Sequence, residues 1–392
     1  MGRFAAALRQ PGLNAIAEVK RRSPSAGELR PNADPAALAA TYERAGAAAV
    51  SILVDERFGG TWDDLRAARA SASLPLLAKG FFSTEVDLRS AREAGADAVL
   101  LLLRDLDDAT ARRLLAAATE LGLEALVEAH DALELERAIG LDAPVVGINA
   151  RDLATFRIDR RRQLDLVTQC HKRAGDRVVV AESGIESRAQ GAAAELAGAD
   201  AILIGSTLMR ARDPGAKLAE LVSRPLVKVC GLTREEDVAA AAEAGADLVG
   251  FVFVETSPRR APNDLLVSDT VSDTCLTVAV TVAEDDAHGA DLVQRYSHEE
   301  GRVRGRDAVL LRDGEEVARV VDLPWQENDP THFDRARAVE GRLMLAGGLG
   351  PENVRSAIDA VAPWAVDASS SLESAPGVKD HDRVRAYVEA AR

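Results

Sequence analysis

The chain has little of what several protein classes depend on. Among its 392 residues there are three cysteines, and aromatic residues make up 4%. The cysteines, Cys170, Cys230 and Cys275, are far apart and form no C-x-x-C pair. No secretory leader is recognisable at the start, so we expect no disulfide framework and a reducing, cytoplasmic location.

Long apolar runs and basic clusters are missing as well. No apolar stretch approaches the roughly 18 residues that a membrane-spanning helix needs, so we expect no membrane partner. Carboxylates outnumber cationic side chains by 63 to 48, and the formal net charge is −15. Nucleic-acid-binding proteins concentrate Lys and Arg, so we expect no nucleic-acid partner. The six histidines have no ligand spacing with cysteine or carboxylate, and we predict no metal site.

A phrase of about eleven residues recurs four times along the chain. It reads RAGAAAVSILV from residue 44, EAGADAVLLLL from 93, LAGADAILIGS from 196 and EAGADLVGFVF from 243. Each copy predicts a helix end, a glycine in the left-handed conformation and a short buried strand. Apolar strands that alternate with amphipathic helices indicate a parallel sheet covered by helices.

The first half contains enough of these strands to close a barrel. We predict eight, at residues 15–20, 48–53, 74–78, 98–102, 124–127, 144–148, 178–181 and 201–204. Because the chain is long for one hydrophobic core, we place a boundary at Arg224–Pro225, with domains at residues 1–224 and 225–392.

The second half has fewer recognisable units. We predict strands at 226–229, 248–253, 276–282, 343–346 and 364–367, and a helix at 235–244. Between 282 and 322 the pattern is poor, and AVLLRDGEEVARVV predicts a hairpin around Asp-Gly. The predicted fold is therefore α/β, with two (β/α)8 TIM-type barrels in tandem, the second shortened and irregular in its middle.

Polar residues follow most strands of the first barrel. The carboxyl ends of barrel strands meet at one mouth, where TIM barrels place their chemistry. Strand alternation puts Glu18 and Lys20 on one face, which would be the lumen. A buried structural ion-pair network is the alternative interpretation. The candidates are Glu18, Lys20, Asp55, Lys79, Glu128, Asn149, Arg151, Glu182, Ser183, Gly184, Gly205 and Ser206.

Two features of these residues indicate specific roles. Glycines at strand ends before helices make anion pockets, and Gly184 and Gly205 follow strands seven and eight, where this architecture binds phosphate. Ser23 could add a hydroxyl donor or could be a turn residue. Lys20 and Lys79 would share a partly buried mouth, and burial with mutual repulsion predicts a lowered lysine pKa, suited to a general acid.

Residues 14–224 resemble indole-3-glycerol-phosphate synthase, through AEVKRRSPS, LAKGFF, ALVEAHD, GINARDL, AESGI and ILIGSTLMR. Residues 225–392 resemble phosphoribosylanthranilate isomerase, through VKVCGLTREEDV, GFVFVETSPR, LAGGLGPENV, VDASSSLES and PGVKD. Together they resemble the bifunctional fusion of tryptophan biosynthesis. The resemblance implies sugar-phosphate substrates and no cofactor, and we expect a monomer.

For the first half, the resemblance implies that carboxyphenylamino-deoxyribulose phosphate loses CO₂ and water to give indoleglycerol phosphate. Lys79 would be the general acid on the carbonyl oxygen, Lys20 would bind the substrate carboxylate, and Glu128 would assist the dehydration. The positioning residues would be Glu18, Asn149, Arg151 and Glu182, and the phosphate-binding residues Ser23, Ser183, Gly184, Gly205 and Ser206.

For the second half, the resemblance implies an Amadori rearrangement of phosphoribosylanthranilate with Cys230 as base and Asp322 as acid. An anion-binding mouth would favour the Cys230 thiolate, although a lone cysteine is also commonly an inert packing residue. Arg259 would hold the anthranilate carboxylate. The phosphate positions fall on Gly347, Gly348 and Ser369.

Three alternatives stay open at this point. Where the isomerase family has a glycine-rich phosphate loop, this chain has QENDPT with Glu327 and Asp329, so the second barrel could be a non-catalytic module fused to an active synthase. The chain could also bind a sugar phosphate without catalysis in either half. Histidine-pathway isomerases are a further barrel family, but they would have aspartates in place of Glu18 and Glu128.

Overall fold

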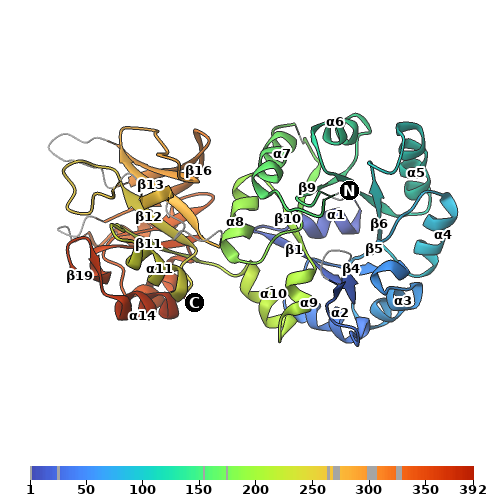
Figure 1. Cartoon of the computed structure of the whole chain (residues 1–392), viewed down its shortest axis with the longest axis horizontal. Coiled ribbons are helices and arrows are strands. Elements are labelled where there is room, and N and C mark those ends of the chain that lie inside the picture. Colours follow the sequence, from blue (N-terminus) through green and yellow to red (C-terminus); the bar gives the residue numbers. More distant parts are fainter. Residues whose placement is uncertain are drawn as a thin grey trace. The chain divides into compact units, whose positions relative to one another are not determined.

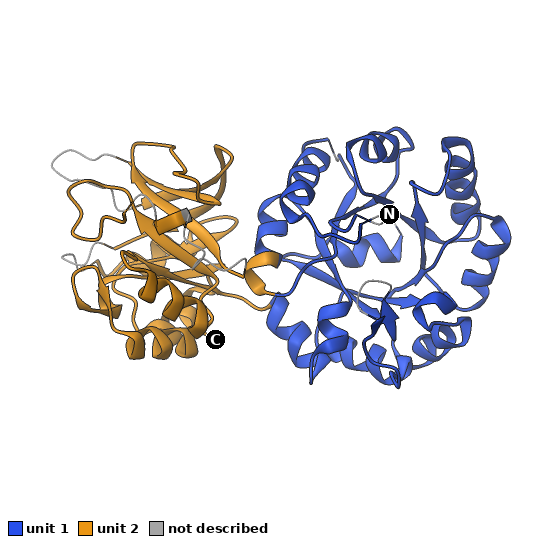
Figure 2. Cartoon of the chain, in the orientation of Figure 1, with its two compact units in different colours: residues 1–186, 191–222 blue, residues 187–190, 223–392 orange. Residues whose placement is uncertain are grey.

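The computed structural model shows two compact units, each with its own closed barrel of eight strands (Figures 1 and 2). It describes residues 2–23, 27–152, 155–173, 175–262, 265–267, 274–297, 307–323 and 329–392. One unit comprises residues 1–186 and 191–222, and the other comprises residues 187–190 and 223–392. The predicted fold class, two TIM-type barrels in tandem, is confirmed.

The first barrel is built from parallel strands only. Its order is β1-β10-β9-β8-β7-β6-β5-β4, and β1 also pairs with β4 to close the ring. The strands are β1 (Asn14–Val19), β4 (Ala49–Leu53), β5 (Leu76–Lys79), β6 (Ala98–Leu102), β7 (Glu124–Ala129), β8 (Val145–Asn149), β9 (Val178–Glu182) and β10 (Ala201–Ile204). These are the eight predicted strands, each displaced by at most two residues at either end.

Helices cover the outside of this barrel, and a short hairpin follows β1. The helices are α2 (Pro35–Arg44), α3 (Trp62–Ser71), α4 (Glu85–Glu93), α5 (Asp108–Glu120), α6 (Ala132–Gly140), α7 (Arg160–Lys172), α8 (Arg188–Leu196), α9 (Ser206–Arg210) and α10 (Pro214–Val222), with a 3₁₀ turn, η1 (Glu56–Phe58). The hairpin consists of β2 (Arg22–Ser23) and β3 (Gly27–Glu28).

Local sequence explains where these helices begin and end. Thr61 and Thr84 each form a capping box with an aspartate three residues later, which satisfies free backbone N–H groups of the first turn. The glycines of the four repeats, Gly46, Gly95, Gly198 and Gly245, have φ between 87° and 101°. This left-handed conformation ends a helix at little steric cost when the residue is glycine, so the predicted repeat unit is confirmed.

A further helix, α1 (Arg3–Leu8), closes the amino-terminal end of the first lumen. Its Phe4, Ala5 and Leu8 are buried in one cluster with inward-facing strand residues such as Ile16. The carboxylate of Glu124, the first residue of β7, accepts hydrogen bonds from the backbone N–H groups of Gly2 and Phe4 at 3.0 and 2.6 Å. The lumen is therefore plugged at one end, and its polar mouth lies at the other.

The second barrel has the strand order β11 to β18 and is mixed. Its elements are β11 (Leu226–Cys230), α11 (Glu235–Ala244), β12 (Leu248–Val252), η2 (Leu265–Val267), β13 (Leu276–Val282), β14 (Leu292–Tyr296), β15 (Asp307–Arg312), β16 (Glu315–Val321), α12 (His332–Arg337), β17 (Leu343–Leu345), α13 (Val354–Val361), β18 (Ala365–Ala368), η3 (Ser370–Leu372), β19 (Glu373–Ala375), β20 (Val378–Lys379) and α14 (His381–Ala391).

One strand of the second barrel runs against all the others. Strand β15 pairs antiparallel with both β14 and β16, whereas the remaining pairs are parallel. The turn between β15 and β16 is the Asp313–Gly314 pair, and both residues have positive φ, as a two-residue hairpin turn requires. The predicted hairpin and irregular middle are confirmed. Strand β14, whose buried face carries Gln294, is not predicted by the sequence.

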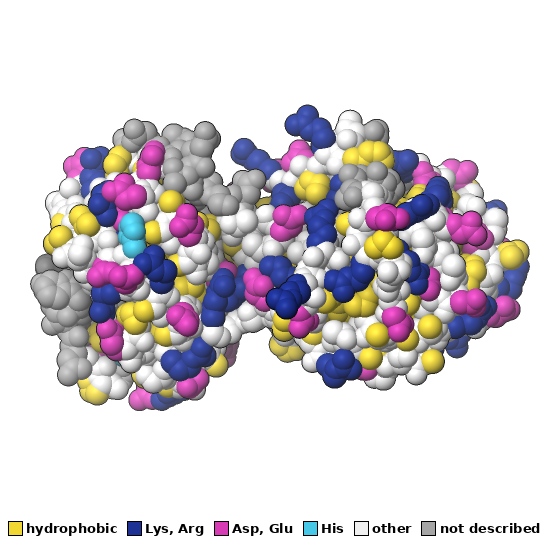
Figure 3. Space-filling view, turned by 60° about the horizontal axis from the view of Figure 1, so that its bottom comes forward, with side chains coloured by type: hydrophobic (Ala, Val, Ile, Leu, Met, Phe, Trp, Pro, Cys, Tyr) yellow, Lys and Arg dark blue, Asp and Glu magenta, His cyan; other side chains and the backbone are white. Residues whose placement is uncertain are grey.

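The charged side chains of both units are mixed in sign on the face drawn in Figure 3, where Lys and Arg alternate with Asp and Glu. Within the described residues, no helix is both long enough and apolar enough to cross a membrane.

Candidate active site

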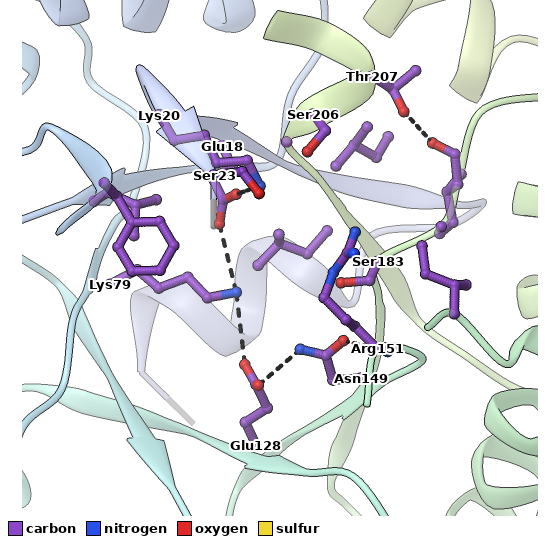
Figure 4. A pocket seen from close by; sticks show the side chains of 18 of the residues that line it. Glu18, Lys20, Ser23, Lys79, Glu128, Asn149, Arg151, Ser183, Ser206 and Thr207 are labelled. Atoms are coloured by element: carbon purple, nitrogen blue, oxygen red, sulfur yellow. Dashed lines mark hydrogen bonds and ion pairs between the residues drawn. The ribbon is translucent and has the colours of Figure 1, made fainter. Parts of the chain in front are cut away.

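The Lys79 ammonium lies among three carboxylates at the mouth of the first barrel, and Figure 4 shows two of them, Glu18 and Glu128. Lys79 is the last residue of β5, and its Nζ donates to Glu182 Oε2 at 2.6 Å. The same Nζ is 3.5 Å from Glu18 Oε2 and 3.6 Å from Glu128 Oε2. The three carboxylates come from β1, β7 and β9, so barrel closure brings together residues that are far apart in sequence.

Glu18 is shared between two lysines. Lys20 follows β1 two residues later on the same face, and its Nζ donates to Glu18 Oε1 at 2.6 Å. Gly205, at the end of β10, makes room for this pair, because a Cβ at that position would lie inside contact distance of Glu18 Oε1 and 2.8 Å from Lys20 Nζ. A side chain at position 205 would therefore displace Glu18 or Lys20.

Glu182 occupies a space that a second glycine leaves open. A Cβ on Gly147 of β8 would overlap Glu182 Oε1 and would lie 3.1 Å from Leu126 Cδ2. The backbone carbonyl of Glu182 accepts from Gln163 Nε2 at 2.6 Å, and the same amide donates to the carbonyl of Ile148 at 2.7 Å. Gln163 of α7 thus holds the ends of β8 and β9 together. The sequence analysis did not single out Gly147 or Gln163.

The predicted lowering of the Lys79 pKa is wrong. Burial alone would lower it, but the attraction of Glu182, Glu18 and Glu128 outweighs burial and raises the pKa of Lys79. The prediction of a lowered pKa weighs burial and repulsion from Lys20, but not the attraction of the three carboxylates that are expected at the same mouth. Lys79 is therefore a firmly protonated ammonium in the free site.

The pKa values of the three carboxylates around Lys79 are shifted in different directions. Burial and repulsion from Glu128 raise the pKa of Glu182, despite its bond to Lys79. Burial opposes ionisation of Glu128 as well, but Lys79 and His130 outweigh it and lower the pKa of Glu128. The pKa of Glu18 is lowered, since Lys20 and Lys79 outweigh its burial. Pairs of groups whose pKa values are pushed apart are typical of acid–base sites.

Glu128 is also held from the side away from Lys79. Asn149 Nδ2 donates to Glu128 Oε1 at 2.8 Å, and His130 Nε2 lies 3.0 Å from the same oxygen. His130 Nδ1 lies 3.0 Å from Glu134 Oε2. The sequence analysis missed His130, although it follows Glu128 by two residues and strand alternation would have placed both on one face.

A cavity of about 650 Å³ opens above this cluster. Its apolar wall includes Phe58, Phe81, Leu102, Phe156 and Ile158. The predicted phosphate ligands line the same cavity, and Gly184 lies directly beside Ile158. Ser183 and Gly184 both have left-handed φ values, 69° and 72°, which is uncommon for serine and typical of functional sites. The polar lining residues are Glu18, Lys20, Ser23, Lys79, Glu128, Asn149, Arg151, Ser183, Gly184, Glu186, Gly205, Ser206, Thr207 and Arg210.

One predicted member of this mouth lies elsewhere. Asp55 does not line the cavity; its carboxylate accepts from the backbone N–H and guanidinium of Arg57, capping the 3₁₀ turn η1. Its role is structural, because a short aspartate after a strand also serves as a turn cap. Arg57 in turn stacks 3.8 Å above the Phe81 ring.

The second barrel contains a chain of buried hydrogen bonds across its lumen. Lys228 Nζ donates to Asp367 Oδ2 at 2.9 Å and to Gln294 Oε1 at 2.7 Å. Gln294 Nε2 donates to Tyr296 Oη at 2.9 Å, and Tyr296 Oη donates to Asp322 Oδ2 at 2.8 Å. This series of hydrogen bonds links β11, the strand that carries the predicted base Cys230, to the predicted acid Asp322.

Cys230 ends β11, two residues after Lys228. A Cβ on Gly250 would lie 2.7 Å from Cys230 Sγ and 2.9 Å from Lys228 Cε, so that glycine leaves room for both side chains. Burial raises the pKa of Cys230, and the nearby charge of Lys228 opposes this only in part. Contrary to the expectation of a thiolate, Cys230 is a protonated thiol in the free barrel.

Two further predicted residues of this barrel, Arg259 and Ser369, lie beside Gly231. Arg259 donates to both oxygens of Glu373 at 2.8 Å, and Glu373 also accepts from Lys379 at 2.9 Å. Arg259 and Ser369 both come within 3 Å of where a Gly231 Cβ would stand. Gly347 and Gly348 have left-handed φ values of 97° and 64°. Glu327 lies outside the described residues.

Comparison with known proteins covers both halves. Residues 2–221 match the family described as indole-3-glycerol phosphate synthase, and residues 325–390 match the family described as N-(5'phosphoribosyl)anthranilate isomerase. Indole-3-glycerol phosphate synthase 2 of Streptomyces coelicolor is 48% identical over 221 residues, which is 56% of this chain and 84% of that protein.

A relative that aligns with nearly the whole chain and a solved structure were also found. The tryptophan biosynthesis protein TrpCF of Yersinia pestis is 34% identical over 411 residues, covering 96% of this chain and 84% of that protein. The crystal structure of TrpF from Jonesia denitrificans has 30% identity, covers 43% of this chain and 97% of that chain, and gives a TM-score of 0.35. The two family matches and the Yersinia pestis relative support the fused interpretation over a synthase with a non-catalytic second barrel. The chain belongs to the family of tryptophan-biosynthesis enzymes that fuse an indole-3-glycerol phosphate synthase domain to a phosphoribosylanthranilate isomerase domain.

Proposed function

We propose that the Lys79 cluster performs the synthase ring closure, with Lys79 as general acid. The observation that carries this proposal is the Lys79 ammonium, held within 3.6 Å of three carboxylates beneath a cavity of about 650 Å³. As the aromatic carbon bonds to the substrate carbonyl carbon, Lys79 gives its proton to the carbonyl oxygen. A fixed ammonium in a water-poor site stabilises the oxygen where negative charge develops.

Lys20 binds the substrate carboxylate and keeps it in place until it leaves as CO₂. Loss of CO₂ is followed by dehydration, in which the new hydroxyl leaves as water and the neighbouring carbon loses a proton. Glu128, hydrogen-bonded by Asn149, exchanges protons with the reacting atoms in this step. Glu18 and Glu182 hold the two ammonium groups in position.

The phosphate and the aromatic ring of the substrate bind to different lining groups of the cavity. The phosphate binds to N–H and O–H donors offered by Ser23, Arg151, Ser183 and Ser206 and by the backbone of Gly184 and Gly205. Phe58 and Phe81 also line the cavity and suit an aromatic ring.

Substitution of the acid tests this assignment. Lys79→Ala should abolish synthase turnover, measured by indole fluorescence. Because it leaves three buried carboxylates without their ammonium, it should also lower the thermal unfolding midpoint, and circular dichroism should show that the barrel is still folded at the assay temperature. Undiminished turnover of carboxyphenylamino-deoxyribulose phosphate by Lys79→Ala would refute the role of Lys79. Absence of turnover in both proteins would instead favour a binding protein without catalysis.

We also propose that Cys230 and Asp322 carry the isomerase reaction, supported by the buried chain that ends at Asp322. Cys230 first loses its thiol proton to solvent, and as the thiolate it takes a proton from the sugar carbon, while Asp322 protonates the ring oxygen that opens. The pairing of Arg259 with Glu373 orients the guanidinium toward the anthranilate carboxylate. Cys230→Ser and Asp322→Asn should each remove isomerase turnover and leave synthase turnover intact; loss of both activities would contradict this division.

A cytoplasmic, monomeric, cofactor-free enzyme is the simplest setting for these reactions. The three cysteines are free and buried, which fits a reducing compartment. Sedimentation velocity of the purified chain tests the monomer, and a concentration-dependent dimer would contradict it.

A further inference from the structure

The synthase reaction as proposed above consumes one proton per turnover. The carbonyl oxygen gains a proton, the departing hydroxyl gains a second, and the neighbouring carbon returns one. The carboxylate leaves as neutral CO₂. One proton must therefore enter the site from outside in every cycle. This inference rests on the proposed synthase function.

Water has little direct access to the groups that need this proton. The Lys79 side chain is 14% exposed, and the side chains of Glu18, Glu128 and Glu182 are 5%, 3% and 1% exposed. A substrate that fills the cavity above them would remove the remaining access. A group that holds a proton on the far side of the cluster could supply it during the reaction.

His130 stands in that position. Its Nε2 lies 3.0 Å from Glu128 Oε1, and its Nδ1 lies 3.0 Å from Glu134 Oε2. The backbone N–H of His130, just before the α6 N-cap Asp131, also donates to Glu134 Oε2 at 2.8 Å, and Glu134 lies in the first turn of that helix. Glu134 therefore orients the imidazole ring, and Nε2 faces Glu128 Oε1 at ion-pair distance, outside hydrogen-bond geometry. The two carboxylates raise the pKa of His130 to about 10 although burial opposes this, so the ring is an imidazolium at neutral pH.

A second cavity gives the ring its own route to water. It has a volume of about 180 Å³ and is lined by His130 and Asn149, among others. Asn149 lines both cavities, whereas His130 lines this one and not the larger one. The other titratable residues that line it are Arg104, Asp131, Asp152, Asp159 and Arg162, and four of them, Arg104, Asp152, Asp159 and Arg162, are exposed.

We propose that His130 supplies the proton that each synthase turnover consumes, passing it through Glu128 to the reacting atoms. While Lys79 is charged, it helps to keep Glu128 ionised. Once Lys79 has given its proton to the substrate, that attraction is gone and Glu128 can accept the Nε2 proton of His130. The ring is left as the neutral Nδ1–H form, and a proton from water restores the imidazolium before the next cycle.

Substitutions at position 130 test this role against a merely structural one. His130→Gln keeps a hydrogen-bond donor near Glu128 but has no proton to give, so we expect kcat to fall about 100-fold with little change in KM. In His130→Ala, the vacated ring space joins the second cavity, and added imidazole should restore at least a tenth of the lost rate. Imidazoles of different pKa should rescue to different extents, which a space-filling effect would not produce. His171→Gln, an exposed histidine of the same barrel, is the matched control and should behave as the wild type.

The outcomes separate this inference from the proposed function. Wild-type turnover that is lost in Lys79→Ala but retained in His130→Gln would overturn the role of His130 alone. A His130→Ala enzyme that is slow and gains nothing from imidazole would overturn it too. No turnover by the wild type would overturn the synthase assignment itself.

Discussion

Gly147 offers a test of how tightly the Lys79 cluster is positioned. It lies in β8 on the inward face between Val145 and Asn149, and an added Cβ would overlap Glu182 Oε1. Non-bonded carbon contacts have their optimum at about 3.5 Å or more, so Gly147→Ala would move the Glu182 carboxylate by roughly 1 Å. Glu182 would then no longer hold Lys79 at 2.6 Å.

The expected cost can be worked out from this displacement. A misplacement of about 1 Å near a reacting centre can cost about 100-fold in rate. Overpacking of a filled barrel lumen typically destabilises a fold by about 1–3 kcal/mol. We therefore expect Gly147→Ala to lower synthase kcat about 100-fold while the protein still folds. Steady-state kinetics and thermal unfolding of the same preparation measure the two effects.

Gly140→Ala is the matched control, because a Cβ at that helix position meets nothing within 4 Å. This variant should retain wild-type kcat and be as stable or slightly more stable, since alanine is favoured over glycine in helices. If Gly147→Ala kept full synthase turnover, the claim that Glu182 positions Lys79 would be wrong.

The second barrel and the first hairpin give further tests. Asp367→Ala leaves the Lys228 side chain, which is 0% exposed, without its carboxylate partner. It should lower the free energy of unfolding, measured in urea, by about 3–5 kcal/mol. The apolar double variant Lys228→Met/Asp367→Leu should recover most of this loss. Tyr296→Phe removes the hydrogen bond to Asp322 and should slow the isomerase about 3- to 10-fold, with synthase rates as the control. The pKa of Asp64 is lowered, since Arg21 outweighs its burial, so this pair stabilises the fold above about pH 4 and the contribution is lost as pH falls through the folded pKa. Arg21→Leu should therefore lower the unfolding midpoint at pH 7 and weaken its fall in acid; an unchanged acid limb would count against this pair.

Much of the first barrel can be predicted from its residues because its strands are buried on both faces. Such strands are continuous apolar runs, and the polar residue that ends each run, such as Lys79 or Glu128, stands out against them. In the second barrel, β14 carries Gln294 and Arg295 among its five residues, so its run is too short and too polar to recognise. The reversed direction of β15 follows from pairing across the barrel, which no local pattern encodes.

The electrostatics of the site could not be predicted in the same way. The sequence places Lys20 and Lys79 at one mouth, but the sign of the Lys79 shift depends on which carboxylates come within 4 Å. That is decided by the register of β1, β7 and β9 and by the space that Gly147 leaves. A glycine in a strand usually indicates a site of low strand stability. Here the absence of a side chain at Gly147 leaves the space that the Glu182 carboxylate occupies.

The hairpin of the second barrel separates two ends of the molecule that an engineer would treat differently. Because β15 runs antiparallel to its neighbours, its turn at Asp313–Gly314 lies at the rim opposite Cys230 and Asp322. Ser297 and Asp307 both lie at the rim that carries those two residues. Peptide tags or fluorescent labels inserted at Asp313–Gly314 should spare turnover.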